Sequence, residues 1–334
     1  MRKVGLNGFG RIGRRLLRLM DDGQRSQVVA INEIADSRML AHLFKYDSTH
    51  GRFDGAVEND EESITINGHR ILVLNKARPS DLPWGDLGVE VVVESTGFLR
   101  DREGNSQHLV NGAKKVIATG LLHQPDLMLV RGVNDGSYDP DHHHLISIGA
   151  GITNLVAPMI KLIHDQFGIE RGRITTLLAM SPDQRILDGP HYNLYRGRSA
   201  AENVIPSDLD YTASTIGQVI PELMGKLTAG LGYRIPIACG YLGEVHLELT
   251  RGTEPNAVNS LLREAAAGLL RGVLAYTEEP IVSSDIVGNP HSCVVDGSWT
   301  SVHGNRLMLL GWQDNETACA RAAMDVISIV QRTP

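Results

Sequence analysis

Residues 2–13 read RKVGLNGFGRIG. The apolar run at the start of this stretch predicts a short buried strand, and the apolar residues beyond it recur at helical spacing. Between strand and helix, Gly8, Gly10 and Gly13 form a G-x-G-x-x-G pattern. In this context the glycines allow a tight turn and a close backbone approach to a pyrophosphate at the helix N-terminus. The stretch therefore predicts a dinucleotide-binding unit.

A carboxylate at the end of the second predicted strand adds to this site. The run QVVAIN (27–32) is apolar enough to be buried, and Glu33 follows it at the spacing of a ribose-binding acid. A carboxylate there accepts hydrogen bonds from both ribose hydroxyls and repels a 2′-phosphate, which favours NAD over NADP. The alternative is a structural glycine turn followed by a solvated Glu. The predicted cofactor-binding residues of this region are Asn7, Gly8, Gly10, Arg11, Ile12, Gly13 and Glu33.

Two further apolar strands are predicted in the same sheet, EVVVES (90–95) and KKVIAT (114–119). Buried strands that alternate with helices indicate a parallel, doubly wound sheet. Ligands of such sheets bind beyond the carboxyl ends of the strands. An ordinary strand-end turn is the alternative interpretation of the residues that follow 90–95. We add Ser95, Thr96, Gly97 and Thr119 to the predicted cofactor site.

The pattern changes at about residue 151. A helical stretch at 153–166 is followed by longer strands of alternating polarity, with another helical stretch at 256–270. The expected strands are GRITTLLAM (172–180), GEVHLELT (243–250), HSCVVDG (291–297) and RLMLLGW (306–312). We therefore expect an α/β chain, with a Rossmann domain followed by an α+β domain that has a mixed sheet.

Composition excludes several classes of protein. The 334 residues suggest two domains, and the formal charge of −7 disfavours nucleic acid or an anionic membrane as the main partner. Cys239, Cys293 and Cys319 are widely spaced, which suggests reduced thiols. The chain enters a strand at once, and its apolar runs stay below the roughly 18 residues of a membrane span. We expect a cytoplasmic protein without a signal peptide.

Two patterns invite a metal or thiolate interpretation. The run DHHHL (141–145) holds three consecutive histidines, but neighbouring residues in a turn point in different directions. Cys293 and His291 lie two apart on a predicted strand, so they share a face. A solvated turn and a small buried thiol are the favoured interpretations. We predict no metal site.

The stretch LISIGAGITNLVAPMIK (145–161) reads as a strand, a glycine-rich turn and a helix that opens at Thr153. A strand-to-helix turn of this kind often carries a catalytic nucleophile. Here the turn is formed by Gly149, Ala150, Gly151 and Ile152, which offer no reactive side chain.

Motifs along nearly the whole chain resemble those of the glyceraldehyde-3-phosphate dehydrogenase family. They include NGFGRIGR, HLFKYDSTHGRF, LPWGDLGVEVVVESTG, GAKKVI, TNLVAPMIKLI, VIPELMGKLT, YRIP and WQDNE, in the family's order. INEIAD (31–36) and HSCVVDG most resemble its erythrose-4-phosphate dehydrogenase branch. The resemblance implies an NAD-binding domain at 1–150, to which a final helix at 315–334 returns, and a catalytic-type domain at 151–314. It also implies a homotetramer.

The resemblance also locates two missing catalytic groups. Counting back from Thr153-Asn154, Gly151 stands at the family's catalytic cysteine, and Leu178 in TTLLAM stands at its catalytic histidine. The family reaction needs a thiolate that attacks an aldehyde and a histidine that lowers the thiol pKa and moves protons. Ala150 and Ile152 replace hydroxyl residues that flank the cysteine. Leu209 and Asp210 fall where a Thr-Gly pair completes the site for attacking phosphate.

Other family positions keep polar residues. Arg234 matches the arginine that grips the substrate's own phosphate, and Ser181, Asp183 and Arg198 match neighbouring positions. Asn315 matches the residue that hydrogen-bonds the nicotinamide carboxamide. The aromatic residue that packs near the nicotinamide ring is replaced by Cys319.

Two functions are compatible with this pattern. The first is a remodelled oxidoreductase that binds NAD and a small phosphorylated or anionic molecule, with His191 or Asp183 as the acid or base. The second is a catalytically silent NAD-binding subunit, regulatory or mixed with an active relative in one oligomer. Nucleic-acid binding through the dinucleotide pocket is disfavoured by the net charge.

Overall fold

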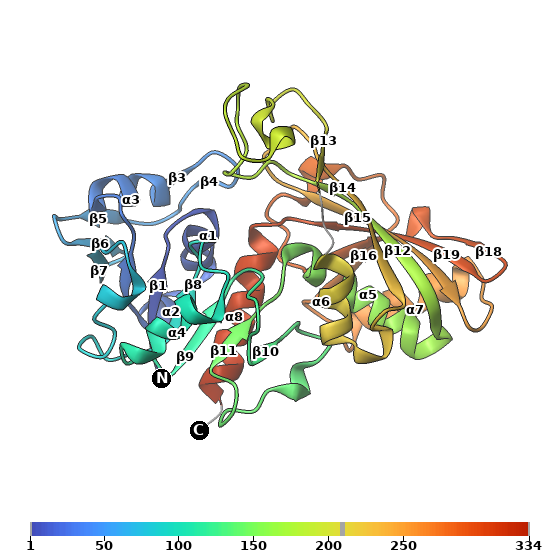
Figure 1. Ribbon diagram of the computed structural model, residues 1–334, viewed down its shortest axis with the longest axis horizontal. Coiled ribbons are helices and arrows are strands. Elements are labelled where there is room, and N and C mark those ends of the chain that lie inside the picture. Colours follow the sequence, from blue (N-terminus) through green and yellow to red (C-terminus); the bar gives the residue numbers. More distant parts are fainter. Residues whose placement is uncertain (1, 208–210, 333–334) are drawn as a thin grey trace. The chain divides into compact units, whose positions relative to one another are not determined.

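The computed structural model describes residues 2–207 and 211–332 (Figure 1). The chain divides into two compact units. The first unit takes in the described residues up to Leu129, then Asp135–Gly149 and the chain from Cys319 onward. The second unit contains Val130–Asn134 and the described residues of Ala150–Ala318.

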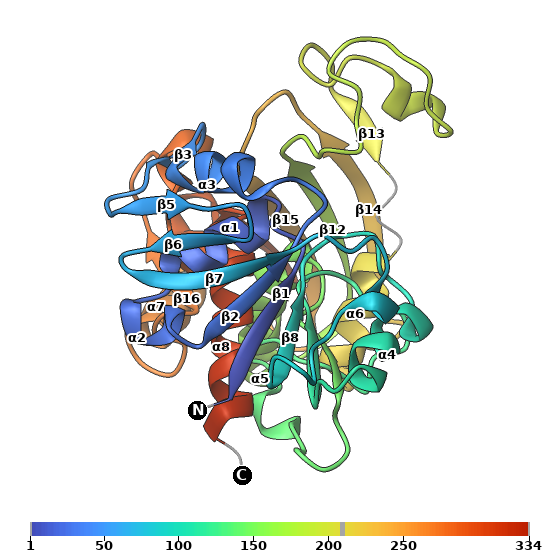
Figure 2. The same ribbon diagram turned by 90° about the vertical axis from the view of Figure 1, so that its left-hand side faces the viewer.

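The sheet of the first unit has the strand order β10-β11-β9-β8-β1-β2-β7-β6-β5. The strands from β10 to β7 are parallel, and β6 and β5 join one edge antiparallel. Figure 2 shows β1 between β2 and β8. The strands are β1 (Lys3–Asn7), β2 (Val28–Asn32), β5 (Val57–Asn59), β6 (Ser63–Ile66), β7 (His69–Leu74), β8 (Val89–Glu94), β9 (Lys115–Ala118), β10 (Leu127–Met128) and β11 (Leu145–Ser147).

The order of these strands creates a place for a ligand. From β1 the chain continues to β2 on one side, whereas β8 pairs on the other side of β1. The carboxyl ends of β1 and β8, Asn7 and Glu94, therefore lie side by side at the point where the strand order reverses. Open parallel sheets bind their ligands at such a switch point.

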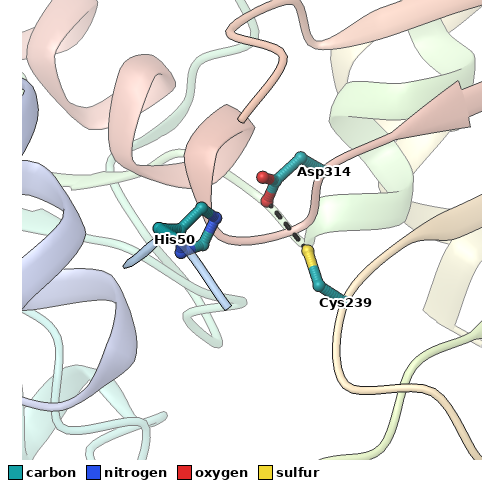
Figure 3. Close-up of side chains that lie close together, drawn as sticks. All are labelled: His50, Cys239 and Asp314. Carbon is teal, nitrogen blue, oxygen red and sulfur yellow. Dashed lines mark hydrogen bonds between the residues drawn. The ribbon is translucent and has the colours of Figure 1, made fainter. Parts of the chain in front are cut away.

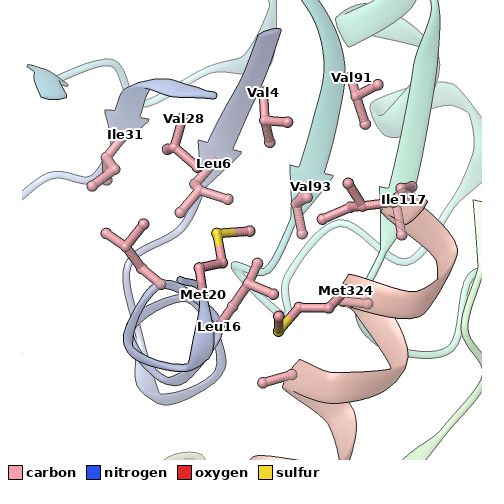
Figure 4. Packing of buried hydrophobic residues seen from close by; sticks show 14 of the residues in the cluster. Val4, Leu6, Leu16, Met20, Val28, Ile31, Val91, Val93, Ile117 and Met324 are labelled. Carbon is pink, nitrogen blue, oxygen red and sulfur yellow. The ribbon is translucent and has the colours of Figure 1, made fainter. Parts of the chain in front are cut away.

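Helices complete the first unit. They are α1 (Arg11–Leu19), α2 (Asp22–Arg25), α3 (Ser37–Lys45), α4 (Arg102–Val110) and α8 (Thr317–Arg332), and β3 (Tyr46–Asp47) pairs with β4 (Gly51–Arg52) as a short ribbon. Ala320, Ala323, Ile327 and Val330 of α8 recur at helical spacing and are buried. They join the core that strand residues and α1 form, part of which is drawn in Figure 4. The last helix thus supplies one wall of the first unit's core.

The second unit is built on a mixed sheet with the order β13-β14-β12-β15-β19-β17-β16, and β18 pairs with β19. The pairs β12–β14 and β16–β17 are parallel, and the others are antiparallel. Its elements are β12 (Ile169–Leu178), β13 (Ile205–Ser207), β14 (Leu227–Arg234), β15 (Tyr241–Leu249), β16 (Leu274–Thr277), β17 (Cys293–Asp296), β18 (Ser301–His303), β19 (Arg306–Gln313), α5 (Gly151–Phe167), α6 (Tyr211–Val219) and α7 (Pro255–Ala267).

Helix α5 lies close against this sheet because strands β15 and β19 carry glycine at the contact with the helix. A Cβ atom on Gly243 would lie 2.9 Å from Val156, and one on Gly311 would lie 3.3 Å from Leu155. The parallel sheet, the mixed sheet and the helices confirm the predicted fold class. One boundary was wrong: α5 begins at Gly151 instead of Thr153, so the glycine belongs to the first helical turn.

Candidate functional site

The glycine turn after β1 is closely packed at two positions and open at a third. Gly8 has φ +93°, and a Cβ atom there would lie 2.6 Å from the backbone nitrogen of Thr96. A Cβ atom on Gly13 would lie 2.4 Å from the Gly8 carbonyl oxygen. At Gly10 a Cβ atom would meet nothing within 4 Å. The turn therefore forms an open cradle at Gly10, as a pyrophosphate requires.

The first turn of α1 faces this cradle without a side-chain cap. Gly10 is the residue before the helix and has no side chain, so no side-chain cap covers the first turn, which includes Arg11 and Ile12. Such a helix end attracts an anion. Glu33 lies at the same turn, where its Oε2 accepts a hydrogen bond from the Phe9 N–H at 2.9 Å. The predicted residues of the turn thus fit a dinucleotide.

The loop after β8 is joined directly to the glycine turn. Ser95 Oγ donates a hydrogen bond to the Gly8 carbonyl at 2.7 Å, and the Thr96 N–H donates to Glu94 Oε1 at 2.8 Å. Thr119 Oγ1 donates to the Glu94 carbonyl at 3.1 Å. Gly97 has φ +75° and open space where a Cβ atom would be. The structure therefore brings the cofactor residues predicted in the first unit together at one edge of its sheet.

Asn315 lies in the second unit, in a turn fixed by a buried carboxylate. Its Oδ1 accepts a hydrogen bond from the Gly240 N–H at 2.9 Å, which leaves the amide nitrogen to donate. Asp314 Oδ1 accepts from Glu316 N–H and Thr317 N–H, both at 2.9 Å, and Oδ2 accepts from Gly288 N–H at 2.7 Å. These bonds hold the turn before α8.

The three thiols are buried. The Cys239 thiol donates to Asp314 Oδ1 at 3.2 Å (Figure 3). Burial and the Asp314 carboxylate raise the pKa of the Cys239 thiol well above its usual range, and burial alone does so for Cys293. A nucleophilic thiolate needs the opposite shift.

Leu178 is the last residue of β12 and is 2% exposed. Its register neighbours are Arg234 on β14 and Tyr241 on β15. The Arg234 Nη1 donates to the Ala179 carbonyl at 2.7 Å, and the guanidinium carbon lies 6.0 Å from the Tyr241 ring centre. A branched apolar side chain therefore stands beside the arginine.

The remaining predicted substrate residues, Ser181, Asp183 and Arg198, lie in the segment after β12 and form contacts within that segment. Ser181 Oγ donates to Asp183 Oδ1, and Asp183 also forms an ion pair with Arg196. Arg198 pairs with Asp188 at 3.2 Å on the surface. These contacts hold Ser181 and Asp183 together, whereas Arg198 is held by a different carboxylate. Leu209 and Asp210 lie outside the residues that the structure describes.

His191 and the histidine run have local roles. The ring Nδ1 of His191 contacts the backbone of Asn193, at 2.9 Å from its nitrogen and 3.0 Å from its carbonyl oxygen. In the run, His142 contacts the Asp139 carboxylate and His143 Nδ1 accepts a hydrogen bond from the Asp139 N–H at 2.9 Å. His144 instead lies 3.3 Å from the Lys115 Nζ, so the three rings form local contacts of the turn.

Sequence reasoning missed a buried polar network under the cofactor turn. Glu94, His108 and Trp84 are each 3% exposed or less. The available signal was a carboxylate that ends an otherwise apolar strand.

The fold and the dinucleotide turn define a Rossmann-type dinucleotide-binding protein, and comparison with known proteins identifies its family. Residues 2–102 match the NAD binding domain of glyceraldehyde 3-phosphate dehydrogenase, and residues 151–315 match its C-terminal domain. The glyceraldehyde-3-phosphate dehydrogenase of Streptomyces coelicolor is 43% identical over 331 residues, which cover 98% of each chain. The enzyme of Geobacillus stearothermophilus is 43% identical over 329 residues, again 98% of each chain. Glyceraldehyde-3-phosphate dehydrogenase 1 of Bacillus subtilis is 42% identical over 331 residues, 99% of this chain and 98% of that one.

The chain therefore belongs to the glyceraldehyde-3-phosphate dehydrogenase family, and NAD is its cofactor. The predicted family and cofactor are confirmed. Within the described residues, each helix is too short or too polar to cross a membrane.

Proposed function

We propose that this chain is an NAD-dependent oxidoreductase that acts on a small phosphorylated or anionic molecule without a thioester intermediate. This proposal rests on Gly151 and Leu178, which stand at the positions that the family resemblance assigns to the catalytic cysteine and histidine. Gly151 begins α5, and Leu178 is a buried aliphatic residue beside Arg234. Glycine has no nucleophile, and leucine accepts no proton. Loss of a general base alone costs about 10²–10⁴ in rate.

The other thiols support this proposal because neither Cys239 nor Cys293 is prepared to take over the attack. Cys239 donates its S–H to a carboxylate, and Cys293 is fully buried in β17. A raised thiol pKa keeps both protonated. We infer that these two thiols do not supply a covalent route.

The remaining chemistry is a hydride transfer between a carbinol and a carbonyl. In the oxidative direction the substrate C–H bond breaks, a proton leaves the hydroxyl group and a C=O bond forms. Bound NAD supplies the hydride acceptor. Arg234, with Ser181, is proposed to hold the anionic group. The proton passes to His191 or Asp183. His191 is proposed to take it on Nε2, in the tautomer whose Nδ1–H donates to the Asn193 carbonyl at 3.0 Å.

A silent NAD-binding subunit is the second candidate, and one observation favours it. Asp183 is already paired with Arg196, and Arg198 is already paired with Asp188. A site whose charged groups satisfy one another has less to offer a substrate. This subunit could regulate an active relative or form a mixed oligomer with it.

Reduced-cofactor absorbance distinguishes the two. The pure protein is incubated with NAD or NADH and a panel of phosphorylated aldehydes, ketones and alcohols. Turnover of any carbinol or ketone supports the oxidoreductase, and calorimetric NAD binding without turnover supports the silent subunit. Glyceraldehyde 3-phosphate and erythrose 4-phosphate should not be oxidised. Their oxidation would overturn the proposal, provided that Gly10→Val, which fills the cofactor cradle, abolishes it and so excludes a contaminant.

Restoring the catalytic cysteine and histidine by mutation gives a second test of the proposal. The double variant Gly151→Cys, Leu178→His returns both missing groups to the scaffold. We expect it to oxidise one of these two phosphorylated aldehydes, whereas either single variant should not. The single Gly151→Cys chain is the control for a thiol without its base.

We further propose that residues 1–150 with 315–334 form the NAD-binding domain and that residues 151–314 form the catalytic-type domain. Family membership supports a homotetramer, or a tetramer mixed with an active relative. The three reduced thiols support a cytoplasmic location. Sedimentation velocity of the purified protein tests the tetramer, and a stable monomer would exclude it.

A further inference from the structure

A buried polar network lies beneath the carboxyl ends of β1 and β8. Glu94 and Asn7 are each 3% exposed, and His108 on α4 and Trp84 are fully buried. We propose that His108 is a positioning residue for NAD binding: through Glu94 it fixes the two backbone segments that form the pyrophosphate cradle. The inference rests on the cofactor and not on the proposed reaction.

The tautomer of His108 follows from its neighbours. The Trp84 indole Nε1 lies 3.0 Å from His108 Nδ1. An indole nitrogen can only donate, so Nδ1 is the acceptor and carries no proton. The neutral ring therefore has its proton on Nε2, which lies 3.3 Å from Glu94 Oε2 and donates to it. The hydrogen bond from Trp84 thus fixes the His108 tautomer in which Nε2–H donates to the Glu94 carboxylate.

The Glu94 carboxylate also accepts hydrogen bonds from the end of β1 and from the loop after β8. Its Oε2 also accepts from the Asn7 amide at 2.5 Å, at the end of β1. Its Oε1 accepts from the Thr96 N–H at 2.8 Å and from the Thr96 hydroxyl. These donors are all neutral, so hydrogen bonds alone meet the buried negative charge. Loss of one donor therefore leaves the carboxylate undersatisfied and free to rotate.

A rotation of the Glu94 side chain would shift the backbone segments that form the pyrophosphate cradle. The Thr96 nitrogen lies 2.6 Å from the position of a Gly8 Cβ atom, so the loop and the glycine turn are in close contact. Asn7 Oδ1 accepts from the Asn32 amide at 2.7 Å, which carries the constraint to β2. A shift of Thr96 or Asn7 must move the backbone at Gly8, and that turn approaches the pyrophosphate.

Two isosteric variants of the full chain separate positioning from simple stability. In His108→Asn, the amide oxygen replaces Nδ1 and keeps the Trp84 bond, but the donor to Glu94 is lost. In His108→Gln, the amide nitrogen replaces Nε2 and keeps the donor to Glu94, but the Trp84 bond is lost. NAD affinity is measured by calorimetry for both, with thermal unfolding beside it.

We expect His108→Asn to bind NAD about tenfold more weakly and His108→Gln to stay within about threefold of the natural chain, although both unfold at lower temperature. Equal losses in the two variants, or an unchanged affinity in His108→Asn, would overturn the proposal. His69→Asn is the matched control, because His69 bonds the Val28 carbonyl at the opposite end of β2. It should lose stability without losing NAD affinity.

A measurement on the unmodified protein covers the case in which a variant fails to fold. Nitrogen NMR of labelled histidine should show His108 with Nδ1 unprotonated and Nε2 protonated. A ring that carries its proton on Nδ1 would overturn the assignment.

Discussion

Gly10, at the end of the turn, and Gly13, in the first turns of α1, are glycine for different physical reasons. A methyl group on Gly13 would press against the Gly8 carbonyl oxygen at 2.4 Å, whereas one on Gly10 would enter open space. We expect Gly13→Ala to destabilise the fold by about 2 kcal/mol, because overpacking of this size typically costs about 1–3 kcal/mol. Gly10→Ala should leave stability unchanged and weaken NAD binding, because the methyl group occupies the cradle.

Urea unfolding and NAD calorimetry of the two glycine variants check this difference. If Gly10→Ala binds NAD as the natural chain does, the cradle is not at Gly10. If Gly13→Ala is as stable as the natural chain, the turn can relax away from the contact.

Asp314 is a second residue whose loss should be costly. It is fully buried and accepts bonds from the Gly288, Glu316 and Thr317 N–H groups. In Asp314→Asn one acceptor oxygen becomes a donor that faces these N–H groups. We expect a loss of about 3 kcal/mol in unfolding free energy, since each unmet donor costs about 1–3 kcal/mol.

Cys239→Ser is the control for Asp314, because it keeps a donor to the same carboxylate. It should change the free energy of unfolding by about 1 kcal/mol or less. A similar loss in both variants would show that the Cys239 contact, and not the capped turn, stabilises this region.

At the scale of elements, periodicity predicted the long helices and strands well. The strands 27–32, 172–180 and 306–312 appear as β2, β12 and β19 with ends that differ by three residues or fewer. Apolar alternation and helical spacing depend only on residues close in the sequence, so the sequence alone shows them. The start of α5 was placed two residues too late because Gly151 reads as part of the glycine-rich turn, whereas it begins the helix and Asn154 donates its side chain back to the Ala150 carbonyl at 3.1 Å.

The site was predictable where a motif encodes backbone geometry and unpredictable where distant residues meet. Gly8 and Gly13 could be assigned because the turn requires glycine. The contact between Trp84 and His108 joins a loop to a helix 24 residues further on, and the contact between Asp183 and Arg196 depends on how a loop folds. Neither leaves a periodic signal in the chain.

Strand β12 carries a hydroxyl that should be dispensable. Thr176 is 1% exposed, and its Oγ1 has no hydrogen-bond partner among the described residues. Thr176→Val keeps the shape and removes the unmet polar group, so we expect about 1 kcal/mol of added stability in urea unfolding. Thr153→Val is the contrast: Thr153 bonds Thr215 at 2.8 Å inside the unit, and its loss should destabilise by about 1–3 kcal/mol. A destabilised Thr176→Val would indicate a buried water at this hydroxyl.

At the scale of the whole molecule, the buried thiols make stability depend on alkaline pH. The ordinary pKa of a thiol is 9.0, and burial raises that of Cys293 in the folded protein. Above pH 9 the unfolded chain releases this proton and the folded chain keeps it, so the free energy of unfolding falls as pH rises. Cys293 alone should contribute about 1.4 kcal/mol per pH unit.

Urea unfolding between pH 8 and pH 10 measures this slope. Cys293→Ala should be less stable at pH 8 because a core side chain is shortened, but its stability should fall less steeply with pH. Parallel curves for the two proteins would contradict the assignment of the slope to this thiol.

The last helix should be essential to the first unit. Ala320, Ala323 and Val330 are fully buried in the core that β1 and α1 also form. A chain that ends at Ala318 would expose this core, so we expect it to lose NAD binding in calorimetry. Addition of a peptide with the residues of α8 should restore part of the binding. Full affinity in the shortened chain would show that the helix only covers the surface.

The position of α8 also has a consequence for how the protein is made. A ribosome delivers the strands of the first unit early but releases the helix that completes their core only after the second unit has been made. At a synthesis rate of roughly 5–20 residues per second, the strands of the first unit remain without helix α8 for on the order of tens of seconds. During that interval their apolar face is open to other nascent chains, so folding in the cell should depend on chaperones that shield the newborn polypeptide.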